Sequence, residues 1–256
     1  MRARCLRAPP RSPRIAAPKT DTNTVRHRAS HQHWRGVALL LAASAQPAQA
    51  QFAGSLNLAS NDIFRGHSTS GDNPALTGSV AFDHHSGLYL GGTLSGMAGE
   101  HHGPRFNATT QFAGWATQAG RISFDAGVIH RRYSRFYTAE YARDYFEAYA
   151  GISGRDLGVR LFYSPDFDNH GRSAVYSEVN ATLLSRERFS LTAHIGGLAP
   201  PKEPGEDSRS VELDWRLGLS RRFVPFTASL DLIGSNAYGD GRATHHKAMI
   251  SISRVF

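Results

Sequence analysis

The feature that most constrains the fold is a strict alternation of apolar and polar residues between positions 210 and 233. Apolar residues occupy every second position from 211 to 219 and from 226 to 232, while Glu212, Asp214 and Asp231 fall between them. A period of two predicts strands with one apolar and one polar face. Residues 220–222 are predicted to form the turn between the two strands. Charges at mid-strand suit a transmembrane barrel with a water-filled lumen. A soluble sandwich shows the same alternation with its apolar face inside, so this hairpin alone does not separate the two folds.

Residues 1–50 differ in composition from the rest and are predicted to be a leader with a cleaved signal peptide. They hold 9 Lys and Arg and one acid, so the net charge of +8 belongs to them and does not indicate nucleic-acid binding. Arg26, Arg28 and Arg35 precede a short apolar run, 37–45, and a small-x-small site, 48–50. Because residues 1–24 lack any periodicity, we expect the true start near position 25.

The only cysteine, Cys5, lies in this leader. The remaining chain therefore has neither a disulfide framework nor a thiolate metal site. Three histidine pairs, 84–85, 101–102 and 245–246, could suggest surface metal capture, but adjacent residues on a strand point to opposite faces and no carboxylate or cysteine spacing supports a site. They are expected to be solvated loop residues. We predict no metal and no cofactor.

About twelve alternating segments follow residue 51, punctuated by Gly, Pro, Asn and Asp. Their predicted spans are 52–64, 75–83, 87–97, 106–117, 121–131, 143–153, 156–164, 173–184, 188–197, 210–220, 223–233 and 246–256. Long connections, such as 65–74, alternate with short ones, which is typical of an up-and-down barrel with long external loops and short periplasmic turns. The sequence thus predicts one all-β domain, 51–256, folded as a transmembrane antiparallel barrel of about 12 strands.

The last predicted strand places apolar residues at every second position and ends on Phe256. A closing strand with a terminal aromatic residue is expected to serve as the signal read by the barrel-assembly machinery. Arg254 breaks the apolar phase, and near the membrane interface its guanidinium can reach toward lipid headgroups.

Several short motifs resemble those of the TorF-type porins of proteobacteria. The most specific one runs from position 61 to 78 and contains Phe64, Arg65, Gly66, Ser68, Pro74 and Gly78. Residues 87–91 and 144–151 resemble two further signatures. The resemblance implies an exported outer-membrane barrel, most simply a porin-like channel, and brings no catalytic residues. The chain departs from the pattern at Ile63 and Thr77, where the family has Tyr and Gln.

If the apolar faces contact lipid, the opposite phase predicts a set of lumen-lining residues: Asp125, Glu147, Arg160, Glu178, His194, Glu212, Asp214, Arg216 and Asp231. Six acids against two arginines favour small cations in a narrow pore. The predicted function is passive diffusion of small solutes across the outer membrane of a Gram-negative bacterium. The alternative is a salt-bridged interior that closes the lumen. The width of a twelve-stranded barrel falls between that of barrels filled by side chains and that of barrels with an open channel. Such a barrel would be a surface binding or structural protein.

A second predicted site is a basic and aromatic extracellular loop comprising Arg131, Arg132, Tyr133, Arg135, Tyr137 and Arg143. It suits binding of lipopolysaccharide phosphates, although a solvated loop neutralised by nearby acids explains it equally well. A third hypothesis is lipid hydrolysis, because His67, Ser68 and Asp72 share one loop and His130 lies near Ser134. Neither group forms a recognised motif. The expected partners are outer-membrane lipids, lipopolysaccharide, the assembly machinery and small solutes.

Overall fold

A computed structural model describes residues 51–99, 103–133, 144–167, 170–199, 211–236 and 245–256. The predicted leader and the proposed start near position 25 lie outside these residues. In the described parts of the chain the secondary structure is strand and turn, and no helix there is long and apolar enough to cross a membrane.

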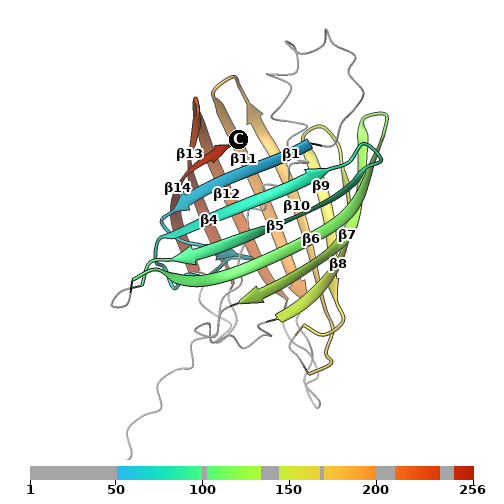
Figure 1. Cartoon of the computed structure of the whole chain (residues 1–256), viewed down its shortest axis with the longest axis horizontal. Helices are drawn as coiled ribbons and strands as arrows, with labels where there is room; N and C mark the ends of the chain where they lie inside the picture. Colours follow the sequence, from blue (N-terminus) through green and yellow to red (C-terminus); the bar gives the residue numbers. More distant parts are fainter. Residues whose placement is uncertain (1–50, 100–102, 134–143, 168–169, 200–210, 237–244) are drawn as a thin grey trace, which may run out of the picture.

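Twelve strands form one closed antiparallel barrel (Figure 1). They are β1 (Gln51–Ala59), β4 (Ala75–Asp83), β5 (Leu88–Met97), β6 (Arg105–Ala119), β7 (Ile122–Tyr133), β8 (Asp144–Ser153), β9 (Leu157–Ser164), β10 (Ala174–Ser185), β11 (Phe189–Ala199), β12 (Glu212–Phe223), β13 (Phe226–Ser235) and β14 (His245–Val255). Each strand pairs with the next one in the chain, and β1 pairs with β14 to close the ring. The predicted fold, an all-β transmembrane barrel of about 12 strands, is confirmed.

Short turns lie at one end of the barrel, which we call the turn end. They comprise residues 84–87, 120–121, 154–156, 186–188 and 224–225. Both described termini lie at this end, because the backbone of Gly54 pairs with that of Phe256 at 2.9 and 3.0 Å. The strand ends that flank the longer connections lie at the opposite end, which we call the loop end. The chain therefore shows the predicted alternation of short and long connections.

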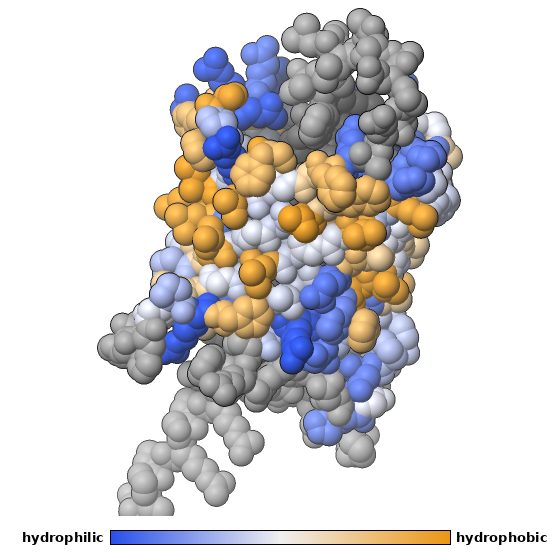
Figure 2. Space-filling view, in the orientation of Figure 1, coloured by the Kyte–Doolittle hydropathy of each residue, from blue (hydrophilic) through white to orange (hydrophobic). Residues whose placement is uncertain are grey.

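The apolar stripe of each strand faces outward. In β12, Leu213 is 52% exposed while the adjacent Asp214 is 4% exposed, and the same contrast separates Leu230 from Asp231. Figure 2 shows apolar residues over the middle of the visible face and hydrophilic residues toward both ends. An apolar exterior with a polar interior is the pattern required by a lipid solvent, because only a closed barrel satisfies all strand hydrogen bonds there.

This orientation predicts that Leu230→Arg destabilises the barrel strongly. Leu230 sits mid-strand between the outward Leu219 and Ile250, and an arginine facing mid-bilayer lipid costs about 2–4 kcal/mol. Ser229→Arg is the matched control, because Ser229 faces inward between the small residues Ser220 and Ser251. Urea unfolding of both variants in lipid vesicles measures the difference, and equal losses would contradict the assigned faces.

Two predicted boundaries are wrong. The first strand ends at Ala59 rather than at 64, and the chain then turns into the barrel to form a small hairpin, β2 (Ile63–Phe64) and β3 (His67–Ser68). Three polar residues in succession, 60–62, interrupt the alternation here, so the sequence does carry a sign of the break. The predicted turn at 220–222 is also wrong, since β12 continues to Phe223 and the chain reverses at 224–225, where Pro225 cannot donate a ladder hydrogen bond.

Candidate functional site in the barrel interior

Residues 60–74, which we call the inward segment, connect β1 to β4 by way of the barrel interior. Ile63 and Phe64 are 1% and 3% exposed, and Ile63 packs with Ala59, Ile233 and Met249. The hairpin reverses at Gly66, which has a φ of 81°. A Cβ at this position would lie 2.5 Å from the Cβ of Ser235. Only glycine therefore permits the hairpin tip to approach the wall of β12 and β13 so closely.

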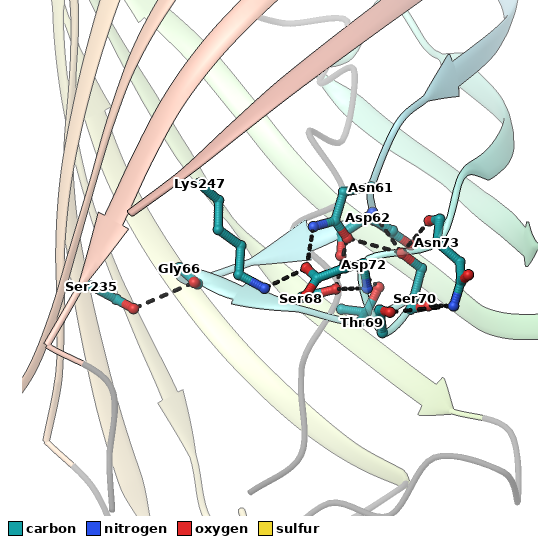
Figure 3. Close-up of polar contacts among 11 residues, drawn as sticks. Asn61, Asp62, Gly66, Ser68, Thr69, Ser70, Asp72, Asn73, Ser235 and Lys247 are labelled. Atoms are coloured by element: carbon teal, nitrogen blue, oxygen red, sulfur yellow. Dashed lines mark hydrogen bonds and ion pairs between the residues drawn. The ribbon is translucent and has the colours of Figure 1, made fainter. Parts of the chain in front are cut away.

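A local network of hydrogen bonds holds the inward segment in shape (Figure 3). The amide of Asn61 donates to Asp72 at 2.7 Å and accepts from the hydroxyl of Ser68 at 2.6 Å. The hydroxyl of Ser70 donates to the carbonyl of Asn73 at 2.6 Å and accepts from the backbone of Asp62 at 3.0 Å. These short-range bonds make the segment an ordered insert with little freedom inside the barrel.

Polar contacts also tie the inward segment to the barrel wall. Asp62 accepts hydrogen bonds from Ser95 of β5 at 2.9 Å and from Asn107 of β6 at 2.8 Å. Three strands from β5 around the ring, Lys247 of β14 forms an ion pair with Asp72. The hydroxyl of Ser235 in β13 donates to the carbonyl of Gly66 at 3.4 Å. The segment therefore bridges strands on opposite sides of the lumen, as Figure 3 shows for its contacts with β13 and β14.

The strongest tether is the buried side chain of Arg65. Its guanidinium donates to Glu147 of β8 at 2.7 Å, and Arg131 of β7 donates to the same carboxylate at 3.2 Å. The Arg65 guanidinium also lies 3.9 Å from the ring centre of Tyr176 and 5.4 Å from that of Phe162. Charge-assisted hydrogen bonds and cation–π contacts are strengthened by exclusion of water, so this cluster anchors the hairpin.

A second ionic cluster lies nearer the turn end. Arg160 of β9 bridges Asp125 at 2.8 Å and Glu178 at 3.2 Å. The hydroxyl of Tyr89 donates to Asp125 at 2.5 Å and also contacts the hydroxyl of Tyr149. These side chains reach from β5, β7, β8, β9 and β10 into one connected network.

A third group surrounds Asp214 of β12. The Nε2 atom of His194 lies 3.0 Å from its carboxylate, and the hydroxyl of Tyr176 donates to it at 3.1 Å. Asn180 contacts the other ring nitrogen of His194 at 2.8 Å. The neighbouring Glu212 lies 3.5 Å from His67 of the inward segment. The polar interior is thus extensively hydrogen-bonded across six consecutive strands, β7 to β12, and the hairpin.

The structure places the nine residues predicted to line the lumen on the inward faces of β7 to β13. They fall into the three groups just described: Glu147 with Arg65, then Asp125, Arg160 and Glu178, then His194, Glu212 and Asp214, with Arg216 and Asp231 beside the third group on β12 and β13. All are buried or half-buried.

The predicted extracellular basic loop is wrong in part. Arg131 and Tyr133 belong to β7 and are 3% and 4% exposed, on its inward face. Arg132 faces outward and lies 3.7 Å from Asp144. The other predicted members, Arg135, Tyr137 and Arg143, lie outside the described residues. The strand is longer than predicted, and its alternation carries Arg131 into the interior.

The connection 65–74, which holds part of the resemblance motif, is predicted to be an external loop, and this prediction is wrong. Phe64, Arg65, Gly66 and Ser68 form the hairpin inside the barrel, Pro74 ends the inward segment, and Gly78 lies on β4. Tyr89 of β5 points inward to Asp125. The histidine pair at 84–85 lies in a turn, whereas 245–246 begins β14 and 101–102 lies outside the described residues.

Sequence reasoning missed Arg65, Arg131 and Lys247 as interior cations. The phase of β7 contained the signal for Arg131, because it follows Asp125 by an even number of positions. Lys247 is likewise in phase with the inward-facing Ser251 of β14. Nothing local indicated that Arg65 would turn inward.

The chemistry of hydrolysis is not assembled in the described parts of the chain. Both ring nitrogens of His130 are engaged, one by Gln111 at 2.7 Å and the other by Asp144. Ser134 lies outside the described residues, and the hydroxyl of Ser68 is bonded to Asn61 rather than to His67. In the same parts, no three His, Cys, Asp or Glu side chains are grouped so as to hold a metal ion.

The ion pair of Asp72 predicts a pH-dependent tether. Burial alone would raise the pKa of Asp72, but Lys247, Asn61 and Ser68 together lower it below its ordinary value. Because the pKa of Asp72 is lower in the folded chain than in the unfolded chain, the stabilisation is complete above the unfolded-state pKa, near pH 4. It is lost as the pH falls through the folded-state pKa. Because Asp72 is well exposed, we expect Asp72→Asn to cost less than about 1 kcal/mol at pH 7. Urea unfolding at pH 7 and pH 3 tests this, and an equal loss at both would refute it.

A closed 12-stranded barrel with an apolar exterior and a charged interior is a transmembrane β-barrel of the porin type. More particularly, the chain belongs to the Gcw_chp family, bacterial proteins of unknown function, whose model matches residues 42–253.

Solved porins share this fold. The NanC porin is 11% identical with a TM-score of 0.51, over 80% of this chain and 98% of that chain. The KdgM porin in complex with disordered oligogalacturonate is 10% identical with a TM-score of 0.50, over 80% and 99%. Among curated proteins, none matches this chain.

Proposed function

We propose that this protein is an outer-membrane channel for the passive diffusion of small polar solutes, exported by a cleaved signal peptide within residues 1–50. One observation carries the proposal: the strands turn charged and hydroxyl side chains inward and apolar side chains outward around a closed ring. Proteins of this architecture commonly conduct solutes through a polar lumen.

The inward segment sets the size of the solutes. It bridges opposite walls through Asp62, Arg65 and Asp72, and therefore narrows the lumen toward the loop end. We propose that only small molecules pass, between the segment and the wall.

Charge selectivity is proposed to be weak, with a slight preference for cations. Six acids on the inward faces favour cations, as the sequence predicts. Arg65, Arg131 and Lys247 add positive charge that the sequence analysis did not place in the interior. Mixed charges of nearby opposite sign largely cancel in the field that a permeating ion experiences.

Liposome swelling tests the proposal directly. Vesicles containing the refolded protein are diluted into solutes of graded size and charge, with protein-free vesicles as the control. Swelling with small solutes that declines steeply with size is expected. No swelling with any solute, together with no single-channel steps in planar bilayers, would rule out the channel.

The second candidate is a barrel whose lumen is closed and whose role is structural or surface binding. The burial of Ile63 and Phe64 favours it, since these side chains fill part of the interior. Both functions share the proposed insertion route, in which the assembly machinery recognises the final strand. The exposed ring of Phe256 and its backbone pairing with Gly54 support that route. We also propose, from the motif resemblance, that the chain is a TorF-type porin.

A further inference from the structure

The turn end of the barrel carries an exposed ring of positive charge. Seven arginines are exposed there: Arg121, Arg155, Arg186, Arg188, Arg221, Arg222 and Arg254. Three acids, Asp83, Asp156 and Glu187, lie among them. Every turn at this end is described, so the excess of arginines holds for the whole rim. A rim of this charge attracts anions at the level where the apolar belt ends.

Two of these arginines face outward, toward lipid rather than toward the lumen. Arg221 lies on the outer face of β12, in phase with Leu217 and Leu219, and Arg254 lies on the outer face of β14, in phase with Ile250 and Ile252. One strand, β13, separates them, and Ala228 of that strand is the register partner of both Arg221 and Ile252, which lies two residues before Arg254. Their Cα atoms are therefore roughly 12 Å apart. Each interrupts an otherwise apolar stripe.

Aromatic rings hold both guanidinium groups in place. The Arg221 guanidinium lies 5.1 Å from the ring centre of Phe189 and 4.6 Å from that of Phe223. That of Arg254 lies 5.9 Å from the ring centre of Phe226 and 5.8 Å from that of Phe256. Within the described chain, neither arginine has a carboxylate partner. Stacking leaves the N–H edges of a guanidinium free to donate to an oxyanion.

We propose that Arg221 and Arg254, with the phenyl rings beside them, form a binding site for the headgroup phosphate of an anionic phospholipid on the outer face of β11 to β14. Two planar guanidinium groups match phosphate oxygens, and the exposed rings of Phe189, Phe223 and Phe226 offer apolar surface to the acyl chains. By the general topology of such barrels, the turn end faces the phospholipid leaflet. The site rests on insertion of the barrel in a bilayer and not on channel activity.

Competition between lipids tests the site. Protein purified from membranes in detergent is mixed with equal amounts of phosphatidylglycerol and phosphatidylcholine, and the retained lipids are counted by native mass spectrometry. We expect phosphatidylglycerol to be retained preferentially. Each arginine near an anionic lipid contributes about fivefold in affinity, so Arg221→Gln with Arg254→Gln should weaken phosphatidylglycerol retention by about 25-fold. Retention of phosphatidylcholine should not change.

Arg155→Gln is the matched control, because Arg155 lies on the same rim but pairs with Asp156 at 3.7 Å and contacts no ring. We expect it to alter lipid retention by less than about twofold. Equal retention of the two lipids by the unmodified protein would overturn the proposal, as would an unchanged preference in the double variant. A loss with Arg155→Gln as large as that of the double variant would show diffuse rim charge instead. Displacement of phosphatidylglycerol by lipid A would also overturn it. Liposome swelling should be the same for all variants, which separates this test from that of the channel.

Discussion

Replacing residues 60–74 with a four-residue turn is expected to raise the single-channel conductance at least about twofold. The inward segment occupies the lumen of a 12-stranded barrel, whose width falls between the filled interior of eight strands and the open channel of sixteen. Removing it leaves the wall intact, because Ala59 and Ala75 are register partners at the ends of β1 and β4. A short Asn- and Gly-containing turn can join such partners. Planar-bilayer recordings measure the conductance.

The matched control for this replacement is Asp72→Asn, which weakens one tether and keeps the segment. It should leave the conductance close to that of the unmodified protein at neutral pH, because the contacts of Asp62 and Arg65 remain. An unchanged conductance after complete replacement would show that another part of the interior limits flow. A permeability cutoff shifted toward larger solutes in liposome swelling would agree with the expected result.

Glu147→Ala is expected to destabilise the barrel by about 3–5 kcal/mol, because it leaves two buried arginines without their shared carboxylate. Arg65, Arg131 and Glu147 are all nearly inaccessible to solvent. Burying an uncompensated charge costs more than the loss of the ion pair itself. Urea unfolding in lipid vesicles, followed by tryptophan fluorescence, measures the loss.

Glu178→Gln is the control for this loss, since Arg160 keeps its contact with Asp125 at 2.8 Å and Glu178 is more exposed than Glu147. A cost of no more than about 1 kcal/mol is expected. The double variant Arg65→Met with Glu147→Met should recover part of the stability lost in Glu147→Ala, because it removes one of the two buried arginines that had shared the carboxylate. If Glu147→Ala were no more costly than Glu178→Gln, the cluster at Arg65 would not anchor the hairpin.

The sequence by itself determined the barrel and the orientation of its faces. Alternation is a local property, since a strand's side chains point to opposite sides whatever its neighbours are. From Leu213, Asp214 and Leu230 one can therefore assign outer and inner faces once the number of segments and the alternating lengths of the connections indicate a closed ring. The same reasoning placed Asp125, Arg160 and Glu178 on the inward faces of their strands, although it could not show that they form a single network.

Only the tertiary structure decided what lies inside the ring. Residues 60–62 are polar in succession, which marks the end of β1, but this local pattern does not show whether the chain then leaves the barrel or enters the lumen. The choice is made by partners far away in the chain: Asn107 for Asp62, Glu147 for Arg65, and Ser235 for Gly66. Those contacts exist only after the barrel has closed. No sequence period records which residues of distant strands face one another across an enclosed space.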